Sequence, residues 1–182
     1  MSIITSQKKI YVGCGEDRRE GFTHCDIRNL PGVDIVCMAW ELSNHVQNVE
    51  EIYSRHMLEH LTSSEVGVTL GDWFKSLTVN GKVYIVVPNL DFHVKQWLNA
   101  QWNESSVKDD RSNAVYGLAG IYGWQRECDP RVEDYRPSYW DVHKTGFNQK
   151  RMQFLLKNAG FSNINIEIKN DVHLVAVAER LA

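Results

Sequence analysis

The chain lacks several features that define other protein classes. No apolar run in its 182 residues approaches the roughly 20 residues that a membrane-spanning helix requires, so we expect no membrane span. The N-terminal stretch has no small-residue cleavage site behind an apolar core, which argues against a secretory signal and favours a cytoplasmic protein. Internal repeats and low-complexity tracts are also missing, and the composition is that of one globular domain spanning residues 1–182.

The chain has few cysteines and a small net charge. The four cysteines include no C-x-x-C pair, so we expect small buried apolar side chains rather than disulfides or zinc ligands. Lysine and arginine number 20 against 23 aspartates and glutamates, which gives a net charge of −3. A chain with this balance has no general electrostatic attraction for nucleic acid, so we expect no nucleic-acid partner.

Short apolar segments separated by turns predict a sheet. The run VDIVCM at 33–38 is continuously apolar, as expected for a strand covered on both faces. Helical spacing over 64–77 predicts a helix capped by Ser63 or Ser64, and Asn80-Gly81 predicts a turn before the next strand. Strands are expected at 9–12, 22–27, 33–38, 52–56, 82–87, 164–168 and 172–178, and a second helix at 148–158. This alternation favours an α/β sheet with mostly parallel strands.

A segment at about 89–142 interrupts the alternation and is rich in aromatic residues. It holds four of the six tryptophans, at positions 97, 102, 124 and 140. Structureless loops of this length are rare in compact domains, so the segment predicts a lid or substrate-binding cap, or helices that extend the core. Trp124 and Trp140 could stack on the face of a sugar or fill the interior of such a cap.

The turn Gly13-Cys14-Gly15 follows the first predicted strand. Ligands of open α/β sheets lie beyond the carboxyl ends of the strands, and glycine lets a ligand approach the backbone there. Asp26 ends the next strand, where a carboxylate can accept hydrogen bonds from both hydroxyls of a ribose. A dinucleotide site requires G-x-G-x-x-G, but the third position is Arg18, and no phosphate-binding P-loop is present. These residues therefore predict a ligand that contains a ribose but no pyrophosphate.

The motifs KIYVGCG…GFTHCDI, VDIV, EIYSRHMLEHL, NGKVYIVVPNL and HKTGF…FLLKNAGF occur in this order along nearly the whole chain. Together they resemble the class I S-adenosylmethionine-dependent methyltransferases, and most narrowly the small methyltransferases of bacterial surface-polysaccharide and sugar-modification clusters. The resemblance implies a Rossmann-like methyltransferase fold, with a mostly parallel central sheet, an antiparallel C-terminal strand and an inserted aromatic-rich cap. It also implies methyl transfer from S-adenosylmethionine, with S-adenosylhomocysteine as product, to a small hydroxylated acceptor such as a sugar or glycolipid.

The resemblance also assigns residues to the cofactor. It places Gly13, Cys14 and Gly15 at its amino-acid and ribose part, Asp26 and Ile27 at the ribose, Met38 and Ala39 at the adenine, and Arg55 and His56 at the methionine. One departure stands out: only residues 16–21 separate the glycine turn from the second strand, so the usual helix there is missing or at most two turns long. A missing helix removes its N-terminal dipole from the cofactor site.

His56, Glu59 and His60 form the pattern H-x-x-E-H, which is also that of an inverted zinc-peptidase motif. That motif requires a helix, whereas here it follows a strand, so peptidase chemistry is not expected. Some methyltransferases of the class that this chain resembles bind a divalent ion through acid-x-x-Glu-His and a later histidine. This chain has His56 at the first position and His143 as the later histidine, which would suit zinc. The alternative is that Glu59 and His60 cap the next helix without metal.

If the acceptor is a hydroxyl, a base must take its proton. His143, in DVHKTGF, is the first candidate, with Asp141 nearby to orient it. His60 is the second, and Asp91 or His93 the third. The competing hypothesis is a catalytically inactive domain of this fold that acts as a binding or scaffolding module. Two observations disfavour nucleic-acid methylation. The net charge is negative, and no base-flipping motif follows the strand that ends in Pro88.

Overall fold

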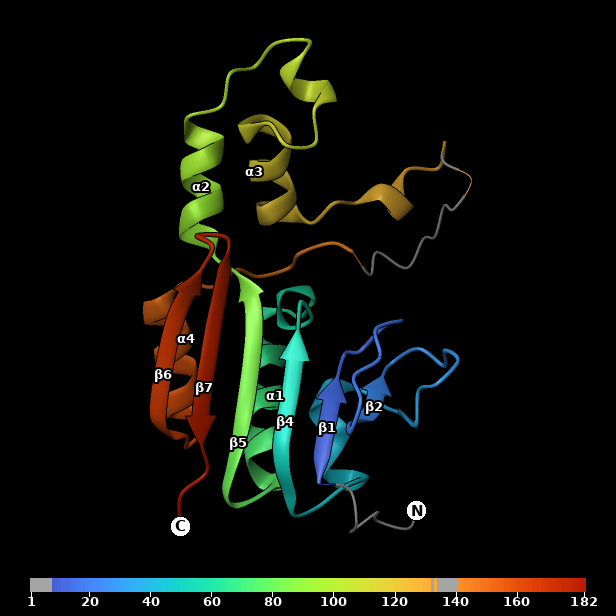
Figure 1. Cartoon of the computed structure of the whole chain (residues 1–182), viewed down its shortest axis with the longest axis vertical. Helices are drawn as coiled ribbons and strands as arrows, with labels where there is room; N and C mark the ends of the chain where they lie inside the picture. Colours follow the sequence, from blue (N-terminus) through green and yellow to red (C-terminus); the bar gives the residue numbers. More distant parts are fainter. Residues whose placement is uncertain (1–7, 132, 134–140) are drawn as a thin grey trace.

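A seven-stranded sheet in the order β3-β2-β1-β4-β5-β7-β6 forms the centre of the computed structural model, which describes residues 8–131, 133 and 141–182 (Figure 1). The strands are β1 Lys9–Val12, β2 Thr23–Asp26, β3 Ile35–Val36, β4 Val49–Arg55, β5 Leu77–Pro88, β6 Ser162–Lys169 and β7 His173–Glu179. The α-helices are α1 Ser63–Ser76, α2 Leu90–Leu98, α3 Asn113–Tyr122 and α4 Gln149–Asn158. The 3-10 helices are η1 Ala39–Asn44, η2 Leu58–His60, η3 Ser106–Lys108 and η4 Arg126–Cys128.

The pairing of the strands confirms the predicted fold class. The strands from β3 to β5 in this order, β3-β2-β1-β4-β5, pair in parallel with one another. β7 pairs antiparallel with both β5 and β6. This mixture of parallel strands with an antiparallel C-terminal pair is the predicted Rossmann-like methyltransferase fold.

Several predicted boundaries are wrong, each for a local reason. β3 has two residues instead of six, and Val36 is 46% exposed, so this strand is not covered on both faces. α1 is capped by Thr62, not by a serine, because Thr62 and Glu65 form a reciprocal capping box. Asn80-Gly81 lies inside β5 instead of before it, where the register against β4 shifts from Val49–Leu77 to Glu51–Lys82.

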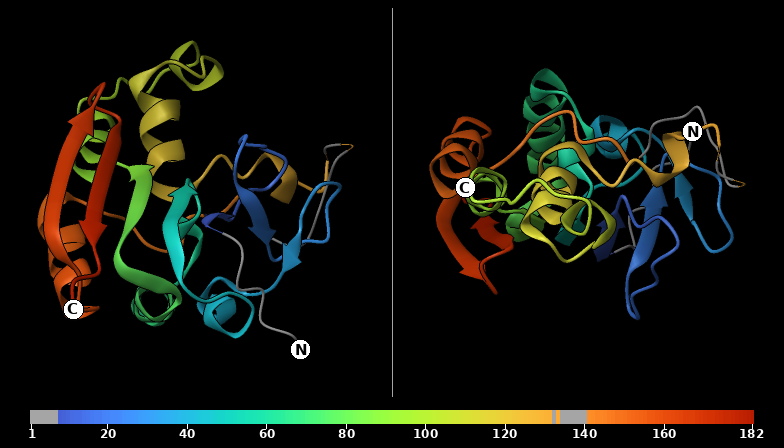
Figure 2. Two further views of the ribbon diagram at one scale, coloured as in Figure 1. Left: turned by 60° about the horizontal axis from the view of Figure 1, so that its bottom comes forward. Right: turned by 90° about the horizontal axis from the view of Figure 1, so that it is seen from above.

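One face of the sheet is covered by helices and carries the main core. Trp73 of α1 and Leu156 of α4 are fully buried against the sheet residues Ile52 and Ile85. Leu42 of η1 joins the same core. α1 and α4 lie on the same side of the sheet in each view (Figure 2).

The opposite face has no helix over it in the described part of the chain. The side chains of Tyr11, Tyr53 and Tyr84 lie at one register level there, on β1, β4 and β5. Right-handed crossovers that move in opposite directions along a sheet place their helices on opposite faces, so β1–β2 and β2–β3 helices would cover this one. The connections at 13–22 and 27–34 contain no helix, which confirms the predicted loss of the first one.

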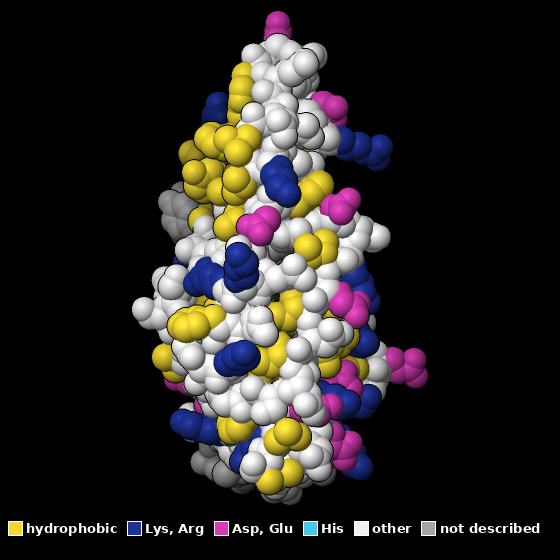
Figure 3. Space-filling model, turned by 90° about the vertical axis from the view of Figure 1, so that its left-hand side faces the viewer, with side chains coloured by type: hydrophobic (Ala, Val, Ile, Leu, Met, Phe, Trp, Pro, Cys, Tyr) yellow, Lys and Arg dark blue, Asp and Glu magenta, His cyan; other side chains and the backbone are white. Residues whose placement is uncertain are grey.

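A cap formed by α2, η3 and α3 lies beyond the carboxyl ends of the parallel strands (Figure 1). The two α-helices approach closely at Gly117, where a Cβ atom would lie 2.8 Å from the backbone nitrogen of Trp97. Trp97 and Leu98 are 42% and 69% exposed, and Figure 3 shows hydrophobic side chains gathered over the cap. The inserted aromatic-rich segment is therefore a helical cap, as predicted, although Trp140 lies outside the described residues.

No helix in the described ranges combines the length and the apolar character that crossing a membrane requires.

Cys14, Cys25 and Cys37 are free thiols. Cys14, Cys25 and Cys37 are buried and Cys128 is half-buried. The prediction that cysteine serves here as a small apolar side chain is confirmed for the three buried positions.

Candidate functional site

A cavity of about 880 Å³ lies between the carboxyl ends of the strands and the cap. Every residue predicted to bind the cofactor lines it: Gly13, Cys14, Gly15, Asp26, Ile27, Met38, Ala39, Arg55 and His56. Three of the predicted bases, His60, His93 and His143, line it as well. One space therefore contains both groups of residues that the sequence singled out.

The glycine turn is held against β2. The backbone N–H groups of Gly13 and Cys14 both donate to the carbonyl oxygen of Cys25, at 2.8 and 3.2 Å. Gly13 and Gly15 have φ angles of 70° and 55°, a region that favours glycine. A Cβ atom on Gly13 would lie 2.1 Å from Cγ of Met57, so the Met57 side chain packs directly on the turn.

Arg18 occupies the place where a crossover helix would begin. Its Nη1 donates to the carbonyl oxygens of Gly15 and Asp17, at 2.9 and 2.7 Å, and its Nη2 donates to that of Pro31. The side chain therefore ties the β1–β2 connection to the β2–β3 connection. It satisfies carbonyl groups that a helix would otherwise have bonded.

Asp26 is 5% exposed, and its carboxylate is fixed by neighbours on both sides. Oδ2 accepts a hydrogen bond from the Gly15 N–H at 2.7 Å. Oδ1 accepts from the backbone N–H and from Nε of Arg28, at 2.9 and 3.2 Å. A carboxylate has about four acceptor positions, so these contacts leave capacity at Oδ2 for a hydroxyl group.

Apolar side chains line the cavity beyond Asp26. Ile27 and Met38 are 37% and 36% exposed, and both line the cavity with Ala39. These residues present an apolar surface that suits a flat aromatic ring.

The segment after β4 turns sharply at His56, whose φ of 49° is in the left-handed region. The chain then enters η2 instead of a long helix, so the inverted zinc-peptidase geometry is absent from the described structure. Nδ1 of His56 lies 3.1 Å from Oε1 of Glu59. The Glu59 side chain is 1% exposed, and its Oε2 has no hydrogen-bond partner among the described residues.

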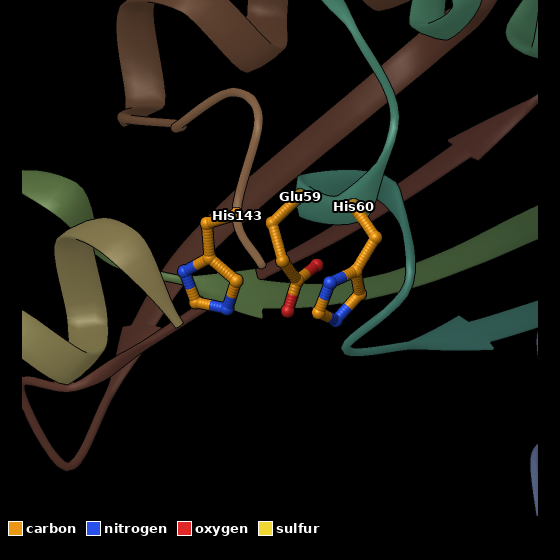
Figure 4. Close-up of side chains that lie close together, drawn as sticks. All are labelled: Glu59, His60 and His143. Carbon is orange, nitrogen blue, oxygen red and sulfur yellow. The ribbon is translucent and has the colours of Figure 1, made fainter. Parts of the chain in front are cut away.

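His60 and His143 lie on either side of the Glu59 carboxylate (Figure 4). The Nδ1 atom of His60 is 3.1 Å from the carbonyl oxygen of Val142, and that of His143 is 3.1 Å from the carbonyl oxygen of Gly120. A carbonyl can only accept, so each Nδ1 carries the proton, and in the neutral ring Nε2 keeps its lone pair. Burial lowers the pKa of His143, which favours that neutral form.

Two aspartates do not occupy the positions that their predicted roles require. Asp91 is exposed, accepts a hydrogen bond from Asn148 Nδ2 at 3.2 Å and does not line the cavity. Asp141 does not orient His143, because its Oδ1 instead accepts from the thiol of Cys128 at 3.3 Å.

Three cavity residues belong to the cap or face it. His93 is 4% exposed, and burial lowers its pKa. Trp124 is 42% exposed, lines the cavity and stacks against the guanidinium of Arg126, which lies 4.3 Å from its ring centroid. Tyr116 lies next to both, with its ring centroid 5.3 Å from that of His93 and 6.2 Å from that of Trp124.

Sequence reasoning missed Arg28, Met57 and His173 as cavity residues. His173 begins β7, yet its ring centroid lies 5.1 Å from that of His56. Only the antiparallel insertion of β7 beside β5 brings it there, and no spacing in the sequence signals that. Of the three, only Arg28 could have been predicted from the sequence, because it is a basic residue two positions after Asp26.

Comparison with known proteins finds the likeness in structure alone. No protein-family model and no curated protein sequence matches the chain. An S-adenosylmethionine-dependent methyltransferase from Methanosarcina mazei superposes with a TM-score of 0.59 at 15% identity, covering 96% of this chain and 92% of that one. One from Archaeoglobus fulgidus gives 0.58 at 13%, covering 95% and 86%.

A third structure was determined with a ligand. It is phosphoethanolamine N-methyltransferase 2 of Haemonchus contortus in complex with S-adenosyl-L-methionine, with a TM-score of 0.57 at 11% identity. The match covers 100% of this chain but 50% of that one. Likeness at these identities establishes that the chain has the fold of these enzymes.

Proposed function

We propose that this chain transfers a methyl group from S-adenosylmethionine to a small hydroxylated or sugar-linked acceptor. The proposal rests on one observation: the same cavity of about 880 Å³ is lined by the glycine turn, by Asp26, and by His60 and His143. Pockets of roughly 300–1,000 Å³ are typical of small-molecule sites. The fold that the chain shares with known methyltransferases supports the same conclusion.

The cofactor would lie along the strand ends. Its ribose hydroxyls would donate to Oδ2 of Asp26, and its adenine would pack on Met38 and Ala39. Its methionine part would lie between the glycine turn and the segment after β4, beside Arg55 and His56. When bound, S-adenosylmethionine supplies an electrophilic methyl group on a sulfonium, so the protein contributes mainly alignment and exclusion of water.

The acceptor would lie between the cofactor and the cap. Its oxygen forms a bond to the methyl carbon as the bond from sulfur to that carbon breaks, and its proton must leave. The lone pair on Nε2 of His143 can take that proton, with His60 as the second candidate, because the carbonyls of Gly120 and Val142 fix both rings. Asp91 does not line the cavity, so we do not assign it this role.

A sugar or glycolipid acceptor is the narrower form of the proposal. Trp124 offers a partly exposed indole face at the cavity, and aromatic faces stack on the apolar faces of sugar rings. The competing scaffolding role is not favoured, because the cavity and its polar groups are intact although the first crossover helix is missing.

Calorimetry on the purified full chain tests the cofactor part. We expect S-adenosylhomocysteine and S-adenosylmethionine to bind with a stoichiometry of one, and NAD⁺, the control, not to bind because the third glycine is replaced by Arg18. No binding of either compound would overturn the proposal. Transfer of a labelled methyl group to a panel of sugars and glycolipids then tests the acceptor class, and labelling confined to amines would contradict it.

A further inference from the structure

Glu59, His60 and His143 each offer one ligand atom, and these atoms all lie within 4.8 Å of one another (Figure 4). We propose that the three side chains bind a divalent metal ion, with Zn²⁺ the best match. The binding site stands on its own geometry. Only the use of the ion in methyl transfer rests on the proposed function.

The first argument comes from the buried carboxylate. Glu59 is 1% exposed, and its Oε1 lies 3.1 Å from Nδ1 of His56. Its Oε2 has no partner among the described residues. An ionised carboxylate buried in this way requires a compensating charge, and no lysine or arginine is described as paired with it. A cation between the two rings would satisfy Oε2.

The second argument comes from the way both imidazoles are held. A metal-binding histidine commonly donates its other ring N–H to a backbone carbonyl, which fixes the tautomer and the direction of the lone pair. His60 and His143 both do this, toward Val142 and Gly120, each at 3.1 Å. The two rings lie on separate segments and are anchored in the same way. The alternative role, in which Glu59 and His60 cap the next helix, would not require this of His143.

The third argument is that the ligands are held together before any ion binds. The carbonyl oxygen of Glu59 accepts hydrogen bonds from the N–H groups of Lys144 and Thr145, at 2.8 and 3.2 Å. The N–H of His143 donates to the carbonyl oxygen of Tyr122 at 3.0 Å. These bonds connect η2, the segment at 142–145 and α3, so the cost of ordering the ligands is already met by the fold.

The ligand set indicates the kind of ion. Two imidazoles and one carboxylate form the protein part of many catalytic zinc sites, where a fourth position remains open, and they also suit Fe²⁺. The acceptor's oxygen would take the open position, and the ion would supply the charge that lowers the pKa of that hydroxyl. With the ion bound, Nε2 of His143 would be a ligand instead of the base, and the proton of the hydroxyl would pass to water.

Metal titration of the full chain tests the site directly. After treatment with chelator, we expect Zn²⁺ to bind with a stoichiometry of one by calorimetry, and Co²⁺ to give the visible absorption of a low-coordinate nitrogen and oxygen site. Glu59→Gln, which keeps the size of the side chain, and His143→Ala should each weaken Zn²⁺ binding by about tenfold or more. His45→Ala, at a half-buried histidine outside the cavity, is the control and should bind as the parent does.

Thiols provide the competing site that the experiment must separate. Sγ atoms of Cys25 and Cys37 lie 3.4 Å apart, and both are free. A thiolate-to-Co²⁺ charge-transfer band, or Zn²⁺ binding unchanged by both cavity variants, would overturn the proposal. So would a complete lack of metal binding.

Cofactor calorimetry in chelator keeps this proposal distinct from the proposed function. The hydrogen bonds of Asp26 join it to Gly15 and Arg28 and not to the three ligands, so we expect cofactor binding to persist without metal. Cofactor binding with no metal binding would overturn the metal site alone. Metal binding with no cofactor binding would overturn the proposed function and leave the metal site intact.

Discussion

The rings of His60 and His143 lie edge to face, with centroids 5.1 Å apart and planes at 68°, and each is anchored through Nδ1 to a backbone carbonyl. This pairing joins η2 to the segment that follows the cap, two parts of the chain more than 80 residues apart. It therefore holds two distant segments together at one wall of the cavity.

Replacing one of these rings should separate chemistry from binding. We expect His143→Ala to lower kcat for methyl transfer by about 10²-fold or more, because either a proton acceptor or a ligand is lost. The affinity for S-adenosylhomocysteine should stay within about threefold of the parent, since the hydrogen bonds that hold Asp26 involve Gly15 and Arg28 and not His143. Steady-state kinetics and calorimetry on one preparation measure both quantities. Unchanged kcat would exclude His143 from the reaction.

The Asp26 carboxylate should dominate recognition of the ribose. We expect Asp26→Ala to weaken cofactor binding by about tenfold or more, because it removes charged acceptors from the hydroxyls and releases Gly15 and Arg28. Glu50→Gln, at an exposed carboxylate paired with Lys8, serves as the control and should bind normally. A loss below about threefold in Asp26→Ala would contradict the assignment.

Gly13 and Gly21 offer a matched pair for testing the turn. Both have positive φ, 70° and 78°, so alanine costs each about 1–2 kcal/mol in backbone strain. Only Gly13→Ala adds a clash, at 2.1 Å from Met57 Cγ, whereas a Cβ on Gly21 meets nothing within 4 Å. We therefore expect Gly13→Ala to lose both more unfolding free energy and cofactor binding, and Gly21→Ala to keep cofactor binding. Equal effects in urea unfolding and calorimetry would contradict this.

A buried histidine should make the stability depend on pH. Burial, the largest cause, lowers the pKa of His93 below its ordinary value of 6.5, so the unfolded chain binds its proton more readily than the folded one. The contribution of His93 is therefore fully present above pH 6.5 and is lost as the pH falls below it. We expect the free energy of unfolding to fall from pH 7 to pH 5.5, and less steeply in His93→Gln. An identical slope in the variant, measured by urea unfolding, would refute this.

Alanine at two helical glycines should act with opposite sign. A Cβ on Gly67, in the middle of α1, meets nothing within 4 Å, so Gly67→Ala should stabilise by about 0.5–1 kcal/mol. A Cβ on Gly117 would lie 2.8 Å from the backbone nitrogen of Trp97, which cannot move independently of α2. Gly117→Ala should therefore destabilise by about 1–3 kcal/mol. Thermal unfolding checks both, and stabilisation by Gly117→Ala would mean that the cap helices are not closely packed.

Local motifs explain what the sequence predicted well. Gly13, Gly15 and Asp26 lie within one strand-turn-strand unit, so their spacing alone places them at the same sheet edge. The burial of β3 was harder to predict. Val36 belongs to an apolar run, yet it is 46% exposed because the crossover helices that would cover it are missing. Boundaries such as Thr62 depend on which of several adjacent hydroxyl residues forms the capping box.

Long-range contacts explain most of what the sequence did not predict. The hydrogen bond from His143 to Gly120 and the position of His173 beside His56 depend on how the cap and β7 return to the sheet. Asp141 is two positions from His143 and was the obvious partner, but its carboxylate accepts from Cys128 instead. Closeness in sequence was therefore a poor guide to this hydrogen-bond partner, because the path of the chain in three dimensions determines it.

The short β1–β2 connection also has a consequence for the order of folding. Ile10 pairs with Thr23, whereas β5 pairs with β7 only after the whole cap and α4 have been traversed, as at Lys82 and Glu179. Closing the longer loop costs about 1.5–2 kcal/mol more chain entropy than closing the shorter one. The half of the sheet that carries Asp26 can therefore form early, while β7, with His173 at its start, joins late. Kinetic studies should find the cofactor side of the cavity protected from hydrogen exchange before the histidine side.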